Sequence, residues 1–218
     1  MSEKLLEVKN LVVQFRTDRG KVTAVNGVDF ELYKGQTLGI VGESGSGKSV
    51  TALSVMRLIP NPPGEIARGE IFFRGQNLLK LPLDEMRKIR GNKIAMIFQE
   101  PMTSLNPVFT VGNQIEEVFA LHQQEFSKSE RRNQGIELLK MVGIPSPERR
   151  YLEYPHQMSG GMRQRVMIAM SLACRPDILI ADEPTSNLDL TARRELMEQL
   201  EQLNAQGKTL LVCSHHAA

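Results

Sequence analysis

The sequence predicts an α/β fold with a mostly parallel sheet, an N-terminal antiparallel β subdomain and a helical insertion. Three observations predict it. The chain opens with β-rich runs of partly alternating polarity, its later part alternates short apolar strands with helical periodicity, and its middle shows helical spacing without strands. With 218 residues, 41% hydrophobic and 24% charged, the chain can bury the core of one domain with one appended subdomain.

The first half of the chain supplies the β-rich elements. Residues 5–15 and 22–32 predict an antiparallel hairpin, and residues 69–79 predict a second one around a turn at Gly75. Residues 37–41 form a short strand before a glycine-rich segment, and a helix follows that is expected to run through Leu58 and to end at the prolines beyond it. Residues 93–98 are a further strand.

The second half predicts helices and two buried strands. Apolar spacing over residues 112–142 is helical, with a polar break near Ser127. Ser159 caps a helix that extends to about Cys174, and residues 177–182 form an apolar strand with an acidic end. An amphipathic helix over Leu190–Ala205 stops at Gly207, and residues 209–213 form the last strand.

Composition excludes some classes of protein. The longest apolar stretch, residues 166–174, is much shorter than the roughly 20 residues that span a bilayer. The N-terminus lacks the pattern of a secretory signal, so a cytoplasmic compartment is expected. Cys174 and Cys213 are interpreted as core residues, not as a disulfide framework. The net charge of +2 is spread over scattered basic pairs, so no nucleic-acid partner is expected.

The strongest motif is a glycine-rich loop between the strand at 37–41 and the helix after it, which is the context that a P-loop needs. Its backbone N–H groups and the helix N-terminus would face the phosphates of ATP, Lys48 would neutralise them, and Ser49 would offer an oxygen to Mg²⁺. A plain glycine-rich turn is the alternative. The predicted nucleotide-binding residues here are Gly42, Glu43, Ser44, Gly45, Ser46, Gly47, Lys48, Ser49 and Val50.

An acidic pair ends the strand at 177–182. Asp182 is predicted to hold Mg²⁺, and Glu183, which precedes Pro184, is predicted to be the general base for the attacking water. The alternative is a solvated acidic turn. Together with the P-loop, the pair predicts a P-loop NTPase core.

The segment from Met158 to Arg165, which reads Met-Ser-Gly-Gly-Met-Arg-Gln-Arg, precedes the acidic strand and resembles the signature of ABC ATPases. The resemblance covers essentially the whole chain. It implies the ABC ATPase fold over residues 1–218, with a nucleotide-binding core at about 1–98 and 175–218 and a helical subdomain at about 99–174. It also implies a head-to-tail dimer in which Ser159, Gly160 and Gly161 close over the ATP held by the second subunit, with the helix N-terminus facing the γ-phosphate.

The same resemblance assigns four single positions. Gln99 resembles the glutamine that senses Mg²⁺ and the lytic water, and Asp189 resembles the residue that couples the two sites, although it is also a candidate N-cap. His215 resembles the histidine that contacts the γ-phosphate, with adjacent His216 as the alternative register. Phe15 resembles the aromatic residue that stacks on adenine, and a core phenylalanine is its alternative interpretation.

Two segments narrow the resemblance. Residues 98–111 and 154–170, with Met162 as the fifth signature residue, are similar to the oligopeptide, dipeptide, glutathione and nickel branch of importer ATPases. This implies a second ATPase subunit, two permeases and an extracytoplasmic solute-binding protein as partners, at the cytoplasmic face of the membrane. Ser186-Asn187 stands where that branch usually has Thr-Ala, and the later segment that ends at His216 is more similar to lipoprotein or macrolide exporters. The chain also ends soon after His215, where members of the family continue, so either the C-terminus is truncated or the protein is unusually short.

Two other functions are alternatives to transport. A soluble ABC ATPase that acts on nucleic acid or ribosomes would keep all the nucleotide motifs, but the chain has no long coiled-coil insertion and no second cassette. A non-catalytic cassette would be expected to lose active-site residues, whereas Lys48, Asp182, Glu183 and His215 are all present. The sequence therefore predicts an ATPase coupled to transport, with ATP and Mg²⁺ as ligands.

Overall fold

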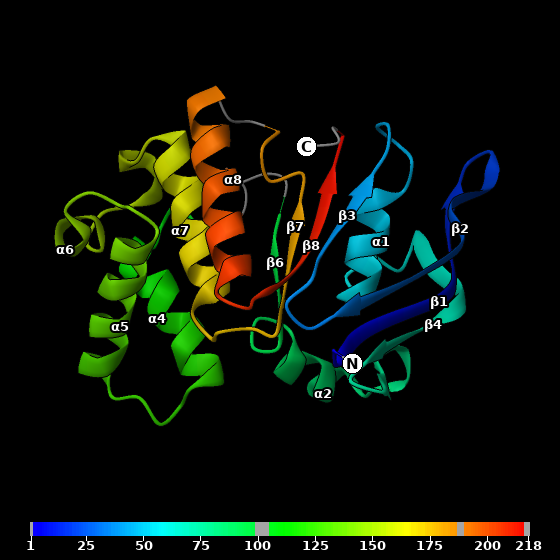
Figure 1. The fold of residues 1–218 in the computed structure, drawn as a ribbon, viewed down its shortest axis with the longest axis horizontal. Helices are drawn as coiled ribbons and strands as arrows, with labels where there is room; N and C mark the ends of the chain where they lie inside the picture. The colour runs from blue at the N-terminus through cyan, green and yellow to red at the C-terminus, as the bar shows by residue number, and fades with distance from the viewer. Residues whose placement is uncertain (1, 99–104, 187–189, 216–218) are drawn as a thin grey trace.

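The computed structural model describes residues 2–98, 105–186 and 190–215, which form two sheets with helices between and beside them (Figure 1). One sheet is antiparallel, with the order β2-β1-β4-β5, and the other is parallel, with the order β3-β8-β7-β6. This arrangement confirms the predicted α/β class. Within the described residues, no helix is both long and apolar enough to cross a membrane.

The antiparallel sheet consists of four strands from the first part of the chain. Its two long strands pair along nearly their whole length, and the second predicted hairpin adds the other two strands. The predicted hairpins are thus confirmed. The strands are β1 (Lys4–Thr17), β2 (Gly20–Tyr33), β4 (Gly64–Phe73) and β5 (Gln76–Asn77).

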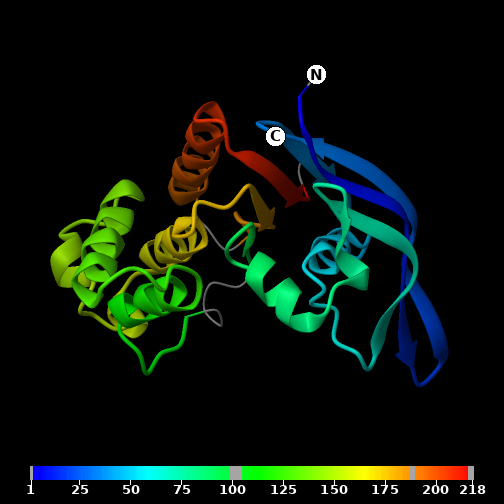
Figure 2. The ribbon, with the colours of Figure 1, turned by 90° about the horizontal axis from the view of Figure 1, so that it is seen from below.

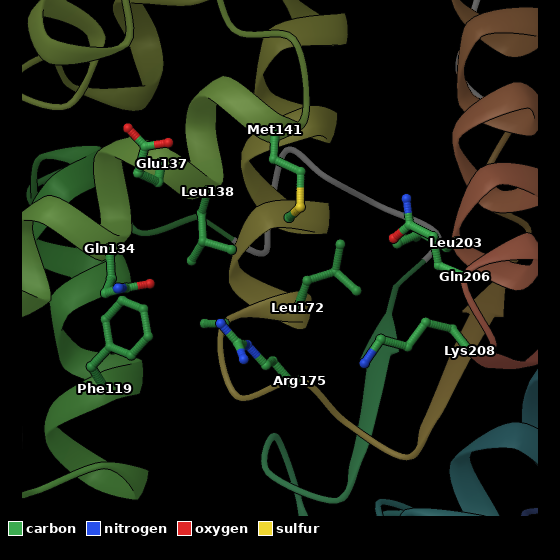
Figure 3. Close-up of a pocket in the computed structure, with 11 residues that line it drawn as sticks. Phe119, Gln134, Glu137, Leu138, Met141, Leu172, Arg175, Leu203, Gln206 and Lys208 are labelled. Carbon is green, nitrogen blue, oxygen red and sulfur yellow. The ribbon is translucent and has the colours of Figure 1, made fainter.

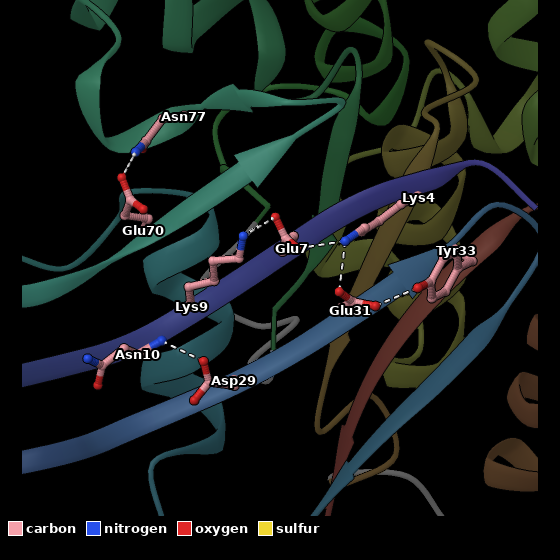
Figure 4. A network of polar contacts seen from close by, with 9 residues as sticks. All are labelled: Lys4, Glu7, Lys9, Asn10, Asp29, Glu31, Tyr33, Glu70 and Asn77. Atoms are coloured by element: carbon pink, nitrogen blue, oxygen red, sulfur yellow. Dashed lines mark hydrogen bonds and ion pairs between the residues drawn. The ribbon is translucent and has the colours of Figure 1, made fainter.

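Charged side chains cover one surface of this sheet (Figure 4). The ammonium of Lys4 lies 2.6 Å from a carboxylate oxygen of Glu7 and 2.7 Å from one of Glu31, which also accepts from Tyr33. Lys4 and Lys9 lower the pKa of Glu7 to about 2. Because these groups are exposed, water and salt screen the network, which supports the β1–β2 pairing only weakly.

The parallel sheet divides the interior into two cores. Alternate residues of its strands face opposite sides, as the two-residue period of a strand requires. In β7 (Ile178–Asp182), Ile178 and Ile180 face the core shared with α1 and the antiparallel sheet, whereas Leu179 and Ala181 face the core built by the other helices. The remaining strands of this sheet are β3 (Thr37–Val41), β6 (Ile94–Ile97) and β8 (Thr209–Ser214).

Helices cover both faces of the parallel sheet. In Figures 1 and 2, α1 lies between the two sheets, and the other long helices gather on the opposite side. α7 packs against β6, and α8 packs against β8. The helices are α1 (Lys48–Val55), α2 (Leu83–Ile89), α4 (Val111–His122), α5 (Lys128–Met141), α6 (Pro147–Arg150), α7 (Gly160–Leu172) and α8 (Leu190–Ala205), with 3₁₀ turns at Leu78–Lys80 and Pro155–Gln157.

The polar break predicted near Ser127 is the boundary between α4 and α5. Ser127 forms a capping box with Glu130, because its Oγ accepts from the Glu130 N–H at 3.3 Å and the Glu130 carboxylate accepts from the Ser127 N–H at 2.7 Å. Farther along the chain, Tyr151 inserts its buried ring beside Gly112 of α4 and Gly135 of α5. These contacts pack the helices into one insertion.

The helix predicted to run through Leu58 ends earlier, at Val55. Arg57 has a left-handed backbone with φ of 50°, and the Arg90 guanidinium donates to the carbonyl oxygens of Met56 and Arg57, both at 2.7 Å. Because a distant side chain takes up these carbonyl groups, the helix stops before the prolines. The short helices α2 and α6 were not predicted, since each buries at most one residue.

Candidate nucleotide-binding site

The glycine-rich loop connects the end of β3 to the first residue of α1. Gly45 and Gly47 have φ of 80° and 92°, in the left-handed region that favours glycine. A Cβ at Gly47 would lie 2.4 Å from the carbonyl oxygen of Ala24 in β2. Glycine is therefore required at residue 47 by both conformation and space. The loop is also tied to β8, because the Gly42 N–H donates to the carbonyl oxygen of Ser214 at 3.4 Å.

Lys48 is buried inside this loop, with 6% of its surface exposed. Its ammonium donates to the carbonyl oxygens of Gly42 and Glu43, at 2.7 and 2.9 Å. The lysine side chain thus curls back over the loop that its own helix follows. A buried cation enclosed by a loop at a helix N-terminus is suited to bind phosphate.

Ser49 and Asp182 form a pair of oxygens next to Lys48. The Ser49 hydroxyl donates to Oδ1 of Asp182 at 2.9 Å, and Asp182 is 4% exposed. Burial raises the pKa of Asp182, and the neighbouring Glu183 carboxylate adds to the shift. A hydroxyl beside a buried carboxylate offers oxygen ligands that suit Mg²⁺, so the pair fits the predicted ion.

Glu183 follows Asp182 at the carboxyl end of β7. Its Oε1 lies 3.1 Å from Nδ1 of His215 and 3.4 Å from Nζ of Lys48. Among the described residues this buried oxygen has two basic side chains as neighbours but no aligned hydrogen bond. The site thus holds a carboxylate oxygen with capacity to accept a further hydrogen bond, as a general base for water must.

The backbone of Glu183 is itself unusual. Its φ is 46°, and its N–H donates to the carbonyl oxygen of Cys213 in β8 at 3.0 Å. A left-handed conformation at a non-glycine residue is strained and is common at functional sites. The turn after β7 therefore holds the side chain of Glu183 in the site at some cost in backbone energy.

Lys48, Ser49 and Glu183 line a cavity of about 160 Å³ at the carboxyl edge of the parallel sheet, and Asp182 lies next to it through its hydrogen bond to Ser49. Its walls come from β2, the glycine-rich loop, α1, and the segments that follow β7 and β8. Ala24 is a wall residue that the sequence did not indicate, because its position depends on how β2 passes the loop. The lining residues are Ala24, Ser44, Gly45, Gly47, Lys48, Ser49, Val50, Glu183 and His215.

A larger cavity of about 350 Å³ lies among the helices of the insertion and α8 (Figure 3). Apolar side chains such as Phe119 and Leu172 form its walls, and Arg175 and Lys208 lie at its edge. None of the predicted site residues lines it. The smaller cavity at the glycine-rich loop is therefore the candidate site on chemical grounds.

The signature segment lies apart from this cavity. Ser159 caps α7, since its Oγ accepts from the Met162 N–H at 3.3 Å. A Cβ placed on Gly160 or Gly161 would meet no atom within 4 Å, so packing within the chain does not require glycine there. None of the three residues from Ser159 to Gly161 lines the cavity at the loop.

Of the other predicted site residues, the structure describes Phe15 but not Gln99 or Asp189. Phe15 lies in β1 opposite Val22 and Gly64, half-buried against the core, and it is not part of the cavity lining. Its predicted contact with adenine stays a prediction. Gln99 and Asp189, as well as His216, lie outside the residues that the structure describes.

Comparisons with known proteins agree with this geometry. The family described as ABC transporter matches residues 25–186. The oligopeptide transport ATP-binding protein OppD of Bacillus subtilis (strain 168) is 52% identical over 213 residues, 98% of this chain and 59% of the relative. The dipeptide transport ATP-binding protein DppD of the same organism is 49% identical over 214 residues, 98% of this chain and 64% of the relative. The chain thus spans about three fifths of these relatives.

Solved structures show the same fold. The dimeric structure of MJ0796, described as a bacterial ABC transporter cassette, superposes with a TM-score of 0.86 at 32% identity, covering 97% of this chain and 88% of that one. A second structure of MJ0796, described as a post-hydrolysis state bound to ADP and Pi, matches equally well. The predicted ABC ATPase fold is confirmed, and the chain belongs to the ABC transporter family.

Proposed function

We propose that this chain is an ATP-binding and ATP-hydrolysing subunit that powers the transport of peptides or similar small solutes through partner permeases. The observation that carries the proposal is the convergence of Lys48, the Ser49–Asp182 pair and the Glu183–His215 pair at one cavity. The names of the relatives, which refer to oligopeptide and dipeptide transport, support the solute class.

The phosphates of ATP bind where the loop and α1 meet. The ammonium of Lys48 exchanges the carbonyl oxygens of Gly42 and Glu43 for phosphate oxygens, and the N–H groups of the loop donate to the same phosphates. Ser49 and Asp182 are the residues that hold Mg²⁺, with Gln99 as a predicted further ligand. The ion supplies positive charge that offsets the charge of the phosphates. Phe15 is proposed to stack on the adenine.

Glu183 accepts a proton from the water that attacks the γ-phosphate, giving ADP and phosphate. Its Oε1 is buried, unpaired by any aligned hydrogen bond among the described residues, and close to two basic groups. His215, 3.1 Å away, is placed to orient both the carboxylate and the γ-phosphate. A positioned base of this kind contributes about 10²- to 10⁴-fold in rate.

The complete site requires a second subunit, identical or paralogous. Gly160 and Gly161 leave open space in front of the N-terminus of α7, which carries about half a positive charge. Docking of this surface on the ATP of a second subunit, head to tail, would bring Ser159 and the helix N-terminus to the γ-phosphate. The coupling role of Asp189 across such a dimer belongs to the same proposal, which the dimeric cassette of similar fold supports.

An exposed apolar surface supports membrane partners. Val108 is 70% exposed and Leu152 58%. A hydrogen bond of 2.9 Å from the Val111 N–H to the Glu153 carbonyl oxygen brings their segments together. Exposed apolar side chains on adjoining segments are one of the features of a docking site. We propose that it receives the permeases at the cytoplasmic face of the membrane, and that an extracytoplasmic solute-binding protein acts through them.

Glu183→Gln tests this function. The variant should bind ATP with nearly wild-type affinity, lose about 10²- to 10⁴-fold in turnover, and form an ATP-dependent dimer. Binding calorimetry, phosphate release and size-exclusion chromatography with light scattering, each with Mg²⁺, measure the three properties. Lys48→Ala is the matched control, because it should weaken ATP binding itself and show no nucleotide-dependent dimer.

The outcomes separate the parts of the proposal. Wild-type turnover in Glu183→Gln would remove Glu183 as the base. Normal ATP binding in Lys48→Ala would remove the loop as the phosphate site. ATP binding without a shift from monomer to dimer would contradict assembly of the site from two identical subunits.

A further inference from the structure

A buried hydrogen bond connects the signature helix to the turn that carries the proposed base. Gln164 lies in α7, 2% exposed, and its side-chain Nε2 donates to the carbonyl oxygen of Pro184 at 3.2 Å. Pro184 directly follows Glu183 and is also buried. Residues 20 apart in the sequence are thus joined at the point where the catalytic carboxylate leaves the sheet.

Within the described part of the chain, the backbone of the turn after β7 makes few other hydrogen bonds. The Glu183 N–H is bonded to Cys213 of β8, and within the turn the Ser186 N–H donates to the Glu183 carbonyl oxygen at 3.1 Å. Proline has no N–H, so residue 184 can be anchored only through its carbonyl group or its ring. Gln164 supplies that anchor from the helix side, which leaves Glu183 held between β8 and α7.

The hydrogen bond from Gln164 helps to hold the strained backbone of Glu183 in place. A residue at φ of 46° relaxes to an ordinary conformation unless its surroundings hold it. Such a relaxation would move the carboxylate relative to Lys48 and His215, which now lie 3.4 and 3.1 Å from Oε1. A displacement of about 1 Å at a catalytic group can cost about 100-fold in rate.

We propose that Gln164 is a positioning residue, through which a movement of α7 changes the position of the Glu183 carboxylate. The inference rests on the proposed function, in which the N-terminus of α7 engages the nucleotide of a second subunit. Because Gln164 belongs to the second turn of the same helix, a shift of α7 on engagement is transmitted through its amide to Pro184. Contact at one nucleotide site thereby adjusts the base of the other.

Gln164→Met tests the proposal, because methionine has a similar length and volume but no donor. We expect kcat for ATP hydrolysis to fall about 10- to 100-fold, while KM for ATP changes less than about 3-fold. Gln199→Met is the matched control. Gln199 donates to the carbonyl oxygen of Val142 at 3.2 Å and lines the same small cavity between α7 and α8 as Gln164, but it has no bond to the turn.

A double-mutant cycle on the full-length protein shows whether Gln164 acts through Glu183. In a Glu183→Gln background, the residual turnover should be the same with and without the Gln164→Met substitution, because the base that Gln164 positions is already gone. A residue that only stabilises the fold would lower both backgrounds by the same factor. Thermal unfolding of each variant shows that the compared proteins are folded.

Three results would overturn the inference. They are unchanged kcat in Gln164→Met, an equal loss in Gln199→Met, or additive losses in the double-mutant cycle. Failure of the proposed function looks different, since Glu183→Gln alone would then retain wild-type turnover. The two failures are therefore distinguishable in one set of proteins.

Discussion

Cys213 lies directly beneath the proposed nucleotide site. Its Sγ is 3.8 Å from the carbonyl oxygen of Lys48, and the side chain is fully buried. Burial raises the pKa of its thiol to about 12, with Asp182 and Glu183 adding to the shift, and burial raises the pKa of Cys174 to about 11. The reactive thiolate forms only as pH rises towards the pKa, so both thiols stay protonated and unreactive at neutral pH.

We therefore expect both cysteines to react with a thiol reagent at pH 8 at least 100-fold more slowly in the folded protein than in denaturant. An unfolded thiol, with a pKa of about 8.5, is roughly one quarter thiolate at that pH. Absorbance of the released chromophore measures the rate and shows two thiols in guanidinium chloride. Cys213→Ala identifies each phase, and rapid modification of the folded chain would contradict the burial.

At the scale of single residues, the sequence predicts which residues meet at the candidate site better than it predicts their conformations. The spacing of Lys48 and Ser49 after glycines, and an acidic pair at a strand end, follow from the chemistry of a triphosphate and Mg²⁺. The left-handed backbone of Glu183 and its contact with His215 depend on the pairing of β7 with β8. No local pattern contains that pairing, so neither feature was predictable.

The glycines of α4 and α7 differ in how closely other side chains of the protein pack against them. A Cβ at Gly112 of α4 would lie 2.2 Å from the ring of Tyr151, a rigid side chain that is buried and bonded through its hydroxyl to Glu116 at 2.7 Å. In contrast, a Cβ at Gly160 or Gly161 of α7 meets open space. Packing within the chain explains the first glycine but does not require the other two, which the proposed approach of a second subunit would explain.

Gly112→Ala is therefore expected to lower the free energy of unfolding by roughly 2 kcal/mol, since the ring cannot move without disturbing α4 and α5. Gly160→Ala should change it by less than about 0.5 kcal/mol or raise it slightly, because alanine favours helices. Urea titration measures both, and ATP turnover should fall only in the second variant beyond what its stability explains. Equal stability losses would contradict the packing at Tyr151.

Whether a helix or strand could be predicted from the sequence depended on its length and on how many of its residues are buried. β1, β6, β7, β8, α4 and α7 each have several buried residues, and their predicted bounds lie within a few residues of those observed. α2 buries only Met86 and α6 none of its residues, so periodicity carries no signal for them. The early end of α1 depends on Arg90, which is 34 residues distant from Met56 in the sequence.

In the proposed dimer, each subunit contributes one half to each of two nucleotide sites. The cavity at the glycine-rich loop includes no residue from Ser159 to Gly161, although both surfaces are suited to phosphate. In the proposed head-to-tail dimer, the loop of one subunit meets the α7 N-terminus of the other, and a symmetric interface repeats this contact twice. An isolated chain should then hydrolyse ATP poorly, and two different defects should be able to complement each other.

Complementation between defective subunits tests this arrangement. Lys48→Ala removes the phosphate cation but keeps the signature surface, whereas Gly161→Asp keeps the cation and places a negative charge before the γ-phosphate. Each variant alone should be inactive. A mixed dimer contains one intact site of two, so an equal mixture should recover part of the wild-type ATPase activity although each variant alone has none. Aspartate also favours the first turn of a helix, so Gly161→Asp should stay folded.

Phosphate release measured over a series of mixing ratios should peak near equal amounts, whereas no recovery at any ratio would mean that each chain builds its site from its own residues.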